Sequence, residues 1–123
     1  MYGVNASIPK TLVRHLVAYE AERLGGQLEK VLLDILDTPV SPELLPPKEG
    51  EIQQKTEDLV GPYELHDFFL YYGIRWSFPP EKVLRLAEYA FAGEHSRETS
   101  LKWRKVFYRR FFQQQFKGSC LPD

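Results

Sequence analysis

The sequence predicts a mainly α-helical fold of about five helices, with one long proline-rich loop between the second and the third. Apolar residues recur at helical spacing through most of the chain, and no segment alternates at period two for long enough to form a strand. Glycine and proline stand where the helical patterns stop and start. With 123 residues, of which 43% are hydrophobic, the chain can form one domain with a modest core.

We expect the first two helices to form a hairpin over residues 7–37. Ser7 is a candidate N-cap with Pro9 in the first turn, and Gly25-Gly26 ends the first helix in a tight turn. The second helix carries apolar residues at i, i+3, i+4, i+7 and i+8, which is typical of one helix face. The expected apolar faces consist of Leu12, Val13, Leu16, Val17 and Leu24 in the first helix, and of Leu28, Val31, Leu32, Ile35 and Leu36 in the second.

Three more helices are expected over residues 62–73, 80–93 and 96–115, followed by a mobile tail over residues 116–123. Proline opens the first two of these helices, glycine ends both of them, and serine caps the third. The residues in these positions are Pro62, Pro79, Pro80, Gly73, Gly93 and Ser96.

The connection over residues 38–61 is unusually long for a small domain and is rich in proline, acidic residues and amides. Loops of this length without repeating structure usually serve a ligand, a lid or a partner. Its carboxylates would suit Mg²⁺, but acids scattered along a solvated loop are the ordinary case. We therefore assign no metal ligand in this chain. The acids concerned are Glu49, Glu51, Glu57 and Asp58.

Cysteine usage and hydropathy favour a cytoplasmic protein. The single cysteine, Cys120, cannot form an internal disulfide, which fits a reducing compartment. The longest apolar run, Phe68 to Tyr72, is far too short to cross a bilayer, and the first ten residues lack the pattern of a signal peptide. We expect the cytoplasm and no contact with a membrane.

Charge is unevenly distributed, although the formal net charge is only -1. Residues 43–67 hold seven acids against two lysines, whereas residues 97–117 hold seven bases against Glu98. Aromatic side chains interleaved with these bases could stack on nucleic-acid bases. The stronger interpretation is that they pack inward while the bases face solvent or one phosphorylated ligand, so nucleic acid is not expected as a partner. The aromatic residues are Trp103, Phe107, Tyr108, Phe111, Phe112 and Phe116.

No short motif typical of a catalytic or nucleotide-binding loop occurs in the sequence. Nucleophile elbows, paired-cysteine zinc signatures, dinucleotide-binding glycine patterns and Walker loops are all absent. The three histidines fall on different segments, and Cys120 has no histidine nearby in sequence, so none is a candidate ligand or nucleophile. From the residues alone, we predict a helical domain with a loop suited to binding.

Three blocks of sequence, in order, resemble the C-terminal part of glutamine-dependent NAD synthetase, a member of the ATP-pyrophosphatase, adenine-nucleotide alpha-hydrolase-like family. The resemblance covers essentially the whole chain. It implies the helical portion of an α/β synthetase domain whose parallel sheet is mostly missing from this chain. The blocks are IPKTLVRHLV, DILDTPVSPELLPPKEGEIQQKTEDLVGPYELHDFFLYY and KVFYRRFFQQQFKGSCLPD.

The resemblance implies a reaction and its participants. Members of the family convert deamido-NAD to NAD: ATP, with Mg²⁺, adenylates the nicotinate carboxylate, and ammonia released from glutamine attacks the activated acyl group. Lys117 is similar to a family lysine that reaches deamido-NAD and the charge developing during adenylation, which gives it a catalytic role. Lys10 is similar to a lysine that contacts the ATP phosphates, and Ser41 to a threonine near the nucleotide. The opening residues Tyr2, Gly3, Val4 and Asn5 correspond to a segment that lines the deamido-NAD site.

The family's Ser-Gly-Gly-x-Asp-Ser signature and its glutaminase domain are absent from this sequence. We therefore expect a fragment that is inactive alone and that depends on the remainder of the synthetase, which the resemblance suggests is a homo-oligomer. Gly118 stands where many relatives have arginine, which removes one possible anion contact. The alternative is a non-enzymatic helical module that binds an anionic partner, RNA or protein, through residues 97–117.

Overall fold

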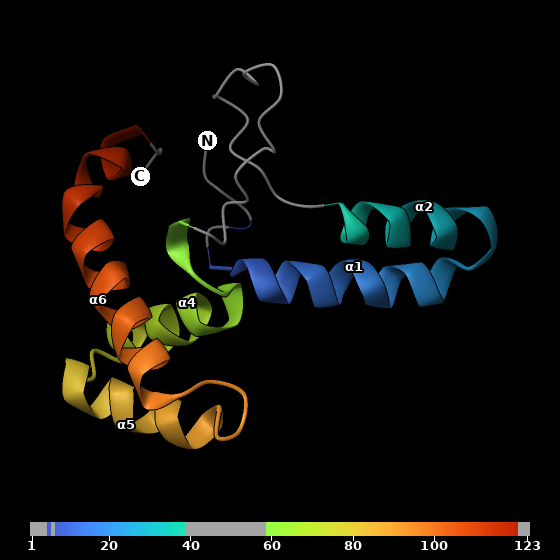
Figure 1. Ribbon diagram of the computed structural model, residues 1–123. Helices are drawn as coiled ribbons and strands as arrows, with labels where there is room; N and C mark the ends of the chain where they lie inside the picture. The colour runs from blue at the N-terminus through green and yellow to red at the C-terminus, as the bar shows by residue number, and fades with distance from the viewer. Residues whose placement is uncertain (1–4, 6, 39–58, 121–123) are drawn as a thin grey trace, which may run out of the picture. The chain divides into compact units, whose positions relative to one another are not determined.

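The fold is known from a computed structural model, which describes residue 5 and residues 7–38 and 59–120. The chain divides into two compact units: Ile8–Leu59 forms one, and Met1–Ser7 with Val60–Asp123 forms the other. The described residues form five α-helices and no strand, which confirms the mainly helical fold (Figure 1). Along these same ranges, no helix is both long and apolar enough to cross a membrane.

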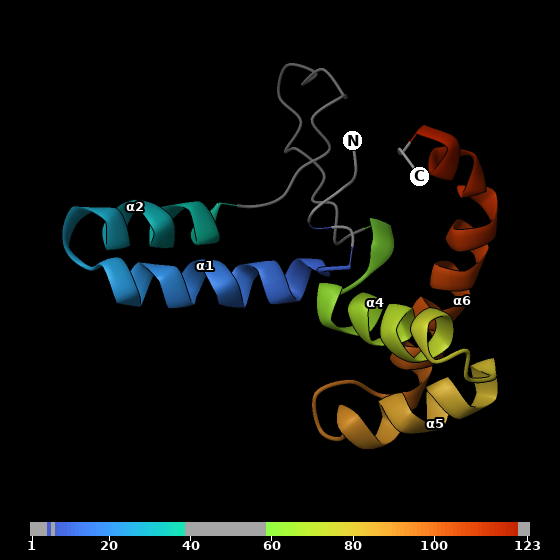
Figure 2. The same ribbon diagram turned by 180° about the vertical axis from the view of Figure 1, so that it is seen from behind.

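The first unit contains a helical hairpin in which α1 (Lys10–Leu24) and α2 (Gly26–Asp37) lie side by side (Figures 1 and 2). The turn uses two successive glycines with positive φ, 64° at Gly25 and 63° at Gly26. Side chains with a Cβ rarely adopt this conformation, so glycine suits both positions. The amide of Gly25 donates a hydrogen bond to the carbonyl of Ala21 and thereby closes the last turn of α1.

The prediction that Ser7 caps the first helix is wrong, because Pro9 occupies the N-cap. The backbone of Pro9 is extended, with φ -71° and ψ 162°, and no side chain caps α1. A residue before proline is pushed away from the α region, so a helix cannot easily include the residue that precedes Pro9. The helix therefore starts at Lys10, and Ser7 lies too far upstream to cap it.

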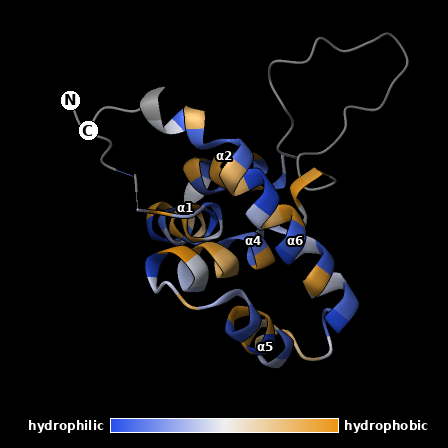
Figure 3. Ribbon diagram, turned by 90° about the vertical axis from the view of Figure 1, so that its left-hand side faces the viewer, coloured by the Kyte–Doolittle hydropathy of each residue, from blue (hydrophilic) through white to orange (hydrophobic). Residues whose placement is uncertain are grey.

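The apolar faces predicted for the hairpin exist, but the hairpin does not bury them. Ala21 is its only buried residue among those described. Figure 3 shows hydrophobic segments on both helices. Apolar surface of this extent usually marks a contact with further protein. The large apolar residues exposed on the hairpin, by 43% to 60%, are Leu12, Val13, Leu16, Tyr19, Leu24, Leu28, Val31, Leu33 and Ile35.

The second unit has a true core. It is built from α4 (Tyr63–Phe69), the π-helix η1 (Leu70–Arg75), α5 (Pro80–Ala90) and α6 (Arg97–Gln113), with α4 and α5 packed against α6. Aromatic residues from α4, η1, α6 and the turns beside α5 surround the core, which is stabilised by apolar burial and by edge and tilted ring contacts. The buried residues of this core are Leu65, Phe69, Val83, Ala87 and Phe107.

Gly73 does not end the third helix as predicted. The chain continues from α4 through η1 to Arg75, and the amide of Trp76 bonds the carbonyl of Tyr71 at 3.1 Å. The glycine has another purpose: a Cβ at Gly73 would lie 2.7 Å from the hydroxyl oxygen of Tyr108. The absence of a side chain at Gly73 makes room for α6. In the sequence alone, a glycine needed for packing looks the same as a glycine that ends a helix.

The remaining helix ends differ from the prediction by a few residues. Helix α5 ends at Ala90, and Gly93 lies in the following turn with φ 89°. Ser96 caps α6 as predicted, since its Oγ accepts a hydrogen bond of 3.2 Å from the amide of Thr99. Leu59 and Val60, placed in the loop by the prediction, have helical backbone, while residues 39–58 of that loop lie outside the described residues.

Gly61 joins the end of the long connection to α6. A Cβ at Gly61 would lie 2.7 Å from Cε3 and 2.9 Å from Cγ of Trp103, so the indole ring rests directly on the backbone. Gly61 is buried and has φ 88°, a conformation that other residues adopt only with strain. Only glycine therefore allows this contact.

We predict that Gly61→Ala destabilises the second unit by about 3 kcal/mol, since it combines overpacking with backbone strain. Urea unfolding followed by tryptophan fluorescence measures the change. Gly118→Ala is the matched control, because a Cβ there meets nothing within 4 Å and Gly118 lacks a positive φ. Equal stability of the two variants would contradict the Gly61–Trp103 contact.

Candidate functional site

Lys117 lies in the 3₁₀ helix η2 (Gln115–Cys120), which directly follows α6. The sequence analysis assigned this residue to a mobile tail, whereas the described part of the tail has regular structure. The amide of Lys117 donates a hydrogen bond of 3.0 Å to the carbonyl of Gln114, and the side chain is exposed. The backbone of Lys117 is thus held while its ammonium group faces solvent.

The packing of α6 on the core determines where η2 begins. Phe107 is buried, and its ring stacks on that of Phe111 with centroids 6.3 Å apart. The side-chain amide of Gln115 then donates a hydrogen bond of 2.7 Å to the carbonyl of Phe111. This chain of contacts runs from the core to the residue that starts η2, so Lys117 is positioned by α6.

The aromatic residues of α6 and η2 pack inward at four of the six positions, as the sequence predicts. Phe107 is buried, Trp103 and Tyr108 pack against the core, and Phe111 is half-buried. The prediction is wrong for Phe112 and Phe116, which are 69% and 64% exposed. Five residues of α-helix turn the chain by about 140°, so Phe112 cannot share the inward face of Phe107.

Two of the seven bases in this segment have structural roles. Arg97 Nε lies 3.1 Å from Glu88 Oε1, and Arg104 Nη1 donates a hydrogen bond of 2.6 Å to the carbonyl of Pro80. Both contacts join α6 to α5. The other five bases are exposed and form no ion pair with the residues that the structure describes. They are Lys102, Lys105, Arg109, Arg110 and Lys117.

Lys10 is the first residue of α1, and it is exposed. The start of a helix carries partial positive charge and amides without helical partners, which together attract anions. Lys10 belongs to the hairpin unit, whereas Lys117 belongs to the other unit.

Only one of the predicted deamido-NAD-lining residues can be described. Asn5 lies in a turn with its side chain exposed. Tyr2, Gly3 and Val4 lie outside the described residues, as does Ser41, the predicted nucleotide contact.

Histidines and acids do not gather into a metal site anywhere in the described ranges: no group of three or more potential ligands is found there. His66 instead packs edge-on against Phe107, with ring centroids 5.1 Å apart, and its Nδ1 lies 3.8 Å from Asp67 Oδ1. His95 packs beside Phe91. Both rings thus contribute to packing in the second unit.

Comparison with known proteins bears directly on the predicted resemblance. Residues covering 99% of the chain are 37% identical to the glutamine-dependent NAD(+) synthetase of Mycobacterium leprae. The corresponding enzymes of Mycobacterium tuberculosis and Mycobacterium bovis are 36% identical over the same share. The chain is homologous to part of glutamine-dependent NAD(+) synthetases. The resemblance found in the sequence is therefore confirmed.

The match covers only a small part of each NAD(+) synthetase. This chain spans about a fifth of the length of these relatives, since the match covers 21% of each. No protein-family model matches the chain, and no solved structure matches it.

Tyr108 was not singled out for function in the sequence, and the structure gives it an unusual environment. Its hydroxyl is buried, and forms no hydrogen bond within the part of the chain that the structure describes. Burial raises the pKa of Tyr108 above the usual 10.0, while the charge of Arg104 opposes the shift. The burial of this hydroxyl could not be predicted from a motif or from residue spacing, because Tyr108 contacts Gly73, which is far from it in sequence.

This raised pKa makes stability depend on pH in one direction. The folded state favours the neutral hydroxyl over the ionised form, so this group lowers stability only above its unfolded pKa of 10.0, as the pH rises through the pKa of the folded state. We predict that Tyr108→Phe changes stability at pH 7 by less than about 1 kcal/mol and makes the protein relatively more stable than wild type above pH 10.

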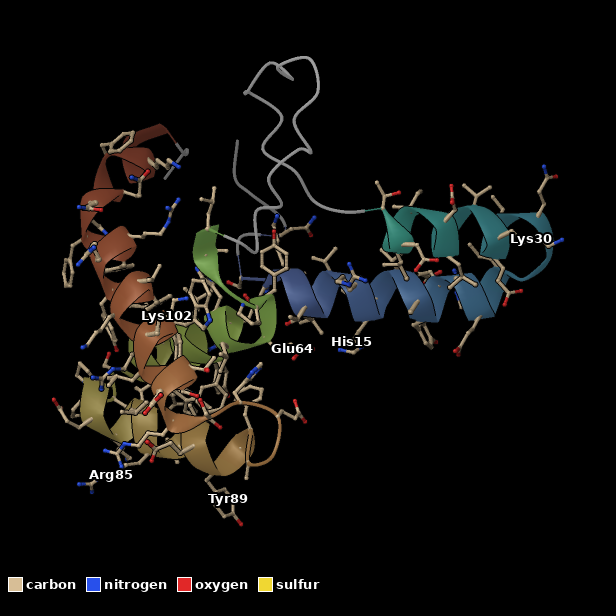
Figure 4. All side chains as sticks on the ribbon, in the orientation of Figure 1. His15, Lys30, Glu64, Arg85, Tyr89 and Lys102 are labelled. Atoms are coloured by element: carbon tan, nitrogen blue, oxygen red, sulfur yellow. The ribbon has the colours of Figure 1, made fainter. Side chains whose placement is uncertain are left out.

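Urea unfolding at several pH values between neutrality and strong alkali measures this difference. Tyr89→Phe is the matched control, because Tyr89 is 86% exposed and points away from α5 (Figure 4). A relative gain for Tyr89→Phe as large as that for Tyr108→Phe would rule out burial as the cause.

Proposed function

We propose that this chain forms the C-terminal part of the synthetase portion of a glutamine-dependent NAD synthetase. The observation that carries this proposal is 37% identity over 99% of the chain to an enzyme of that name. In the complete enzyme, deamido-NAD is amidated to NAD with ATP and with ammonia derived from glutamine. The isolated chain is inactive, because the ATP-binding signature loop and the glutaminase domain are absent from its sequence.

Lys117 has the catalytic role in this proposal. Adenylation brings the carboxylate of deamido-NAD against the triphosphate of ATP, and the two repel each other. An ammonium group at this point neutralises the approaching charges and stabilises the departing pyrophosphate. The exposed side chain of Lys117 on a held backbone suits this purpose, since the cation is free to reach a substrate while its attachment point stays in place.

Lys10 binds ATP phosphates in the proposal, using its own charge and the amides at the start of α1. Ser41 contacts the nucleotide through its hydroxyl. Asn5, with Tyr2, Gly3 and Val4, lines the deamido-NAD site, where a glycine suits close approach of the backbone to a ligand.

ATP enters with Mg²⁺, which neutralises phosphate charge and helps pyrophosphate to leave. The described residues offer cations for the triphosphate and no cluster of acids for the metal. The resemblance places no metal ligand in this chain, and the proposal assigns the metal ligands to the remainder of the enzyme. The proposed location is the cytoplasm, where ATP and glutamine are available.

The exposed faces of the hairpin fit a chain that works within a larger protein. In the proposal, the remainder of the synthetase and a second subunit cover Leu16, Leu28, Ile35 and their apolar neighbours. Burial of such side chains is worth about 2 kcal/mol each, and a hairpin with one buried residue lacks this stabilisation when alone.

A chimeric enzyme tests the proposed function. This chain replaces the matching fifth of the Mycobacterium leprae synthetase, and NAD formation from deamido-NAD, ATP and glutamine is measured. We predict that the chimera is active and that Lys117→Ala lowers its rate about 100-fold, which is the usual cost of removing one group that stabilises transition-state charge. Thermal stability should not change, because Lys117 is exposed.

Arg85→Ala is the matched control, since Arg85 is an exposed base on α5 of the same unit (Figure 4). It should leave the rate within about twofold, as expected for a surface substitution. A folded chimera without activity would overturn the proposal. So would a chimera that fails to fold, because homologous segments must pack against the same surfaces.

A further inference from the structure

One face of α6 carries a line of cations that the proposed catalytic role does not use. Lys102, Lys105 and Arg109 follow one another at i, i+3 and i+7, the spacing of neighbours on one helix face. All three side chains are exposed. They span about 10 Å along the helix axis. We call these three residues, with Phe112, the α6 basic face.

The charges of this face are not neutralised within the described chain. None of its three cations forms an ion pair with a described residue. Lys102, labelled in Figure 4, has its Nζ 4.5 Å from the centre of the Trp103 ring, a contact that orients the cation and leaves its charge in place. Glu98, one turn before Lys102, is the only acid in the whole of α6. The face therefore attracts negative charge.

An apolar anchor continues the same line. Phe112 lies at i+10 from Lys102, and it is 69% exposed. Phe116 follows in η2 and is 64% exposed. Aromatic side chains and arginine are enriched in protein interfaces, whereas lysines belong more often to the polar rim, so an exposed Phe112 beside these cations fits an interface with an apolar anchor and a charged edge. Solvation of the helix would explain the lysines and the arginine, but it does not explain the exposed phenylalanines.

We propose that the α6 basic face is a docking surface for an acidic segment of a partner protein, bound as a helix along α6. Carboxylates of the partner pair with Lys102, Lys105 and Arg109, and an apolar side chain packs on Phe112. This is charge complementarity at matched helical spacing, which gives an interface both register and direction. Lys117 is not one of the residues of this face, so the proposal does not depend on the proposed catalytic function.

Two other occupants are less consistent with the structure. A second copy of α6 would bring like charges together along the same line. Nucleic acid is bound by broad basic surfaces on proteins of high isoelectric point, whereas this chain has net charge -1 and an isoelectric point near 6.3. The excess of seven bases over one acid within residues 97–117 is confined to one helix and its continuation.

The test uses the 123-residue chain and a fluorescein-labelled synthetic peptide. The peptide is an alanine-based helix with glutamate at i, i+3 and i+7 and leucine at i+10. A scrambled peptide of equal composition and a single-stranded oligo(U) are the other probes. Fluorescence anisotropy gives the dissociation constants at low salt, about 50 mM, where exposed charges are least screened.

We expect the patterned peptide to bind more tightly than either other probe. The double substitution Lys105→Glu with Arg109→Glu should weaken its binding at least about tenfold, and Phe112→Ser should weaken it about fivefold. Arg110→Glu is the matched control: Arg110 is exposed on the same helix but lies away from the α6 basic face, and the effect should stay below about twofold.

Three results would overturn the proposal. They are equal binding of the scrambled peptide, tighter binding of oligo(U), and an effect of Arg110→Glu equal to that of the double substitution Lys105→Glu with Arg109→Glu. Circular dichroism of each variant shows whether α6 is retained. If the glutamate variants lose helix, the double substitution Lys105→Gln with Arg109→Gln removes the charges without reversing them. Its effect on peptide binding is then compared with that of Arg110→Gln in the same way.

Discussion

The packing of α6 onto the aromatic core is the constraint on which the second unit depends. Phe107 is buried in that core. Because Gly61 and Gly73 have no side chain, Trp103 and Tyr108 of the same helix can pack directly against their backbone. Aromatic burial of this kind is the largest stabilising contribution available to so small a unit. Since η2 continues from α6, the position of Lys117 follows from this packing. The proposed catalytic residue is thus exposed, and buried residues of α6 determine its position.

The hairpin depends on a different constraint. Its helices are specified by their own sequence and by the Gly25-Gly26 turn, yet only Ala21 is buried. Two short helices without a core are marginal in water, because most helix stability in proteins comes from packing of an apolar face. In the proposed function, the remainder of the enzyme covers the apolar faces of the hairpin. The described residues thus give the second unit a core of its own, whereas the hairpin helices bury only Ala21.

Local patterns predicted the helices, and tertiary packing explains where they failed. Helical spacing identified all five helices, and Ser96 caps α6 as its position suggested. Gly73 was misread as a helix stop, because a glycine that receives Tyr108 cannot be told from a terminator without the fold. The exposure of Phe112 follows from helical geometry and could have been predicted from its distance to Phe107. The role proposed for Lys117 rests only on the family resemblance, because no local sequence pattern distinguishes this lysine from other exposed lysines.

Hydrogen exchange of the 123-residue chain, measured by mass spectrometry, tests the central claim that its two units differ in stability. We expect amides of α4, α5 and α6 to exchange slowly, because the core around Phe69 and Phe107 protects them. Amides of α1 and α2 should exchange at rates close to those of an unfolded peptide. Equal protection in the hairpin of the monomeric chain would contradict the account, because it would show that the hairpin is stable without the protein surface proposed to cover it.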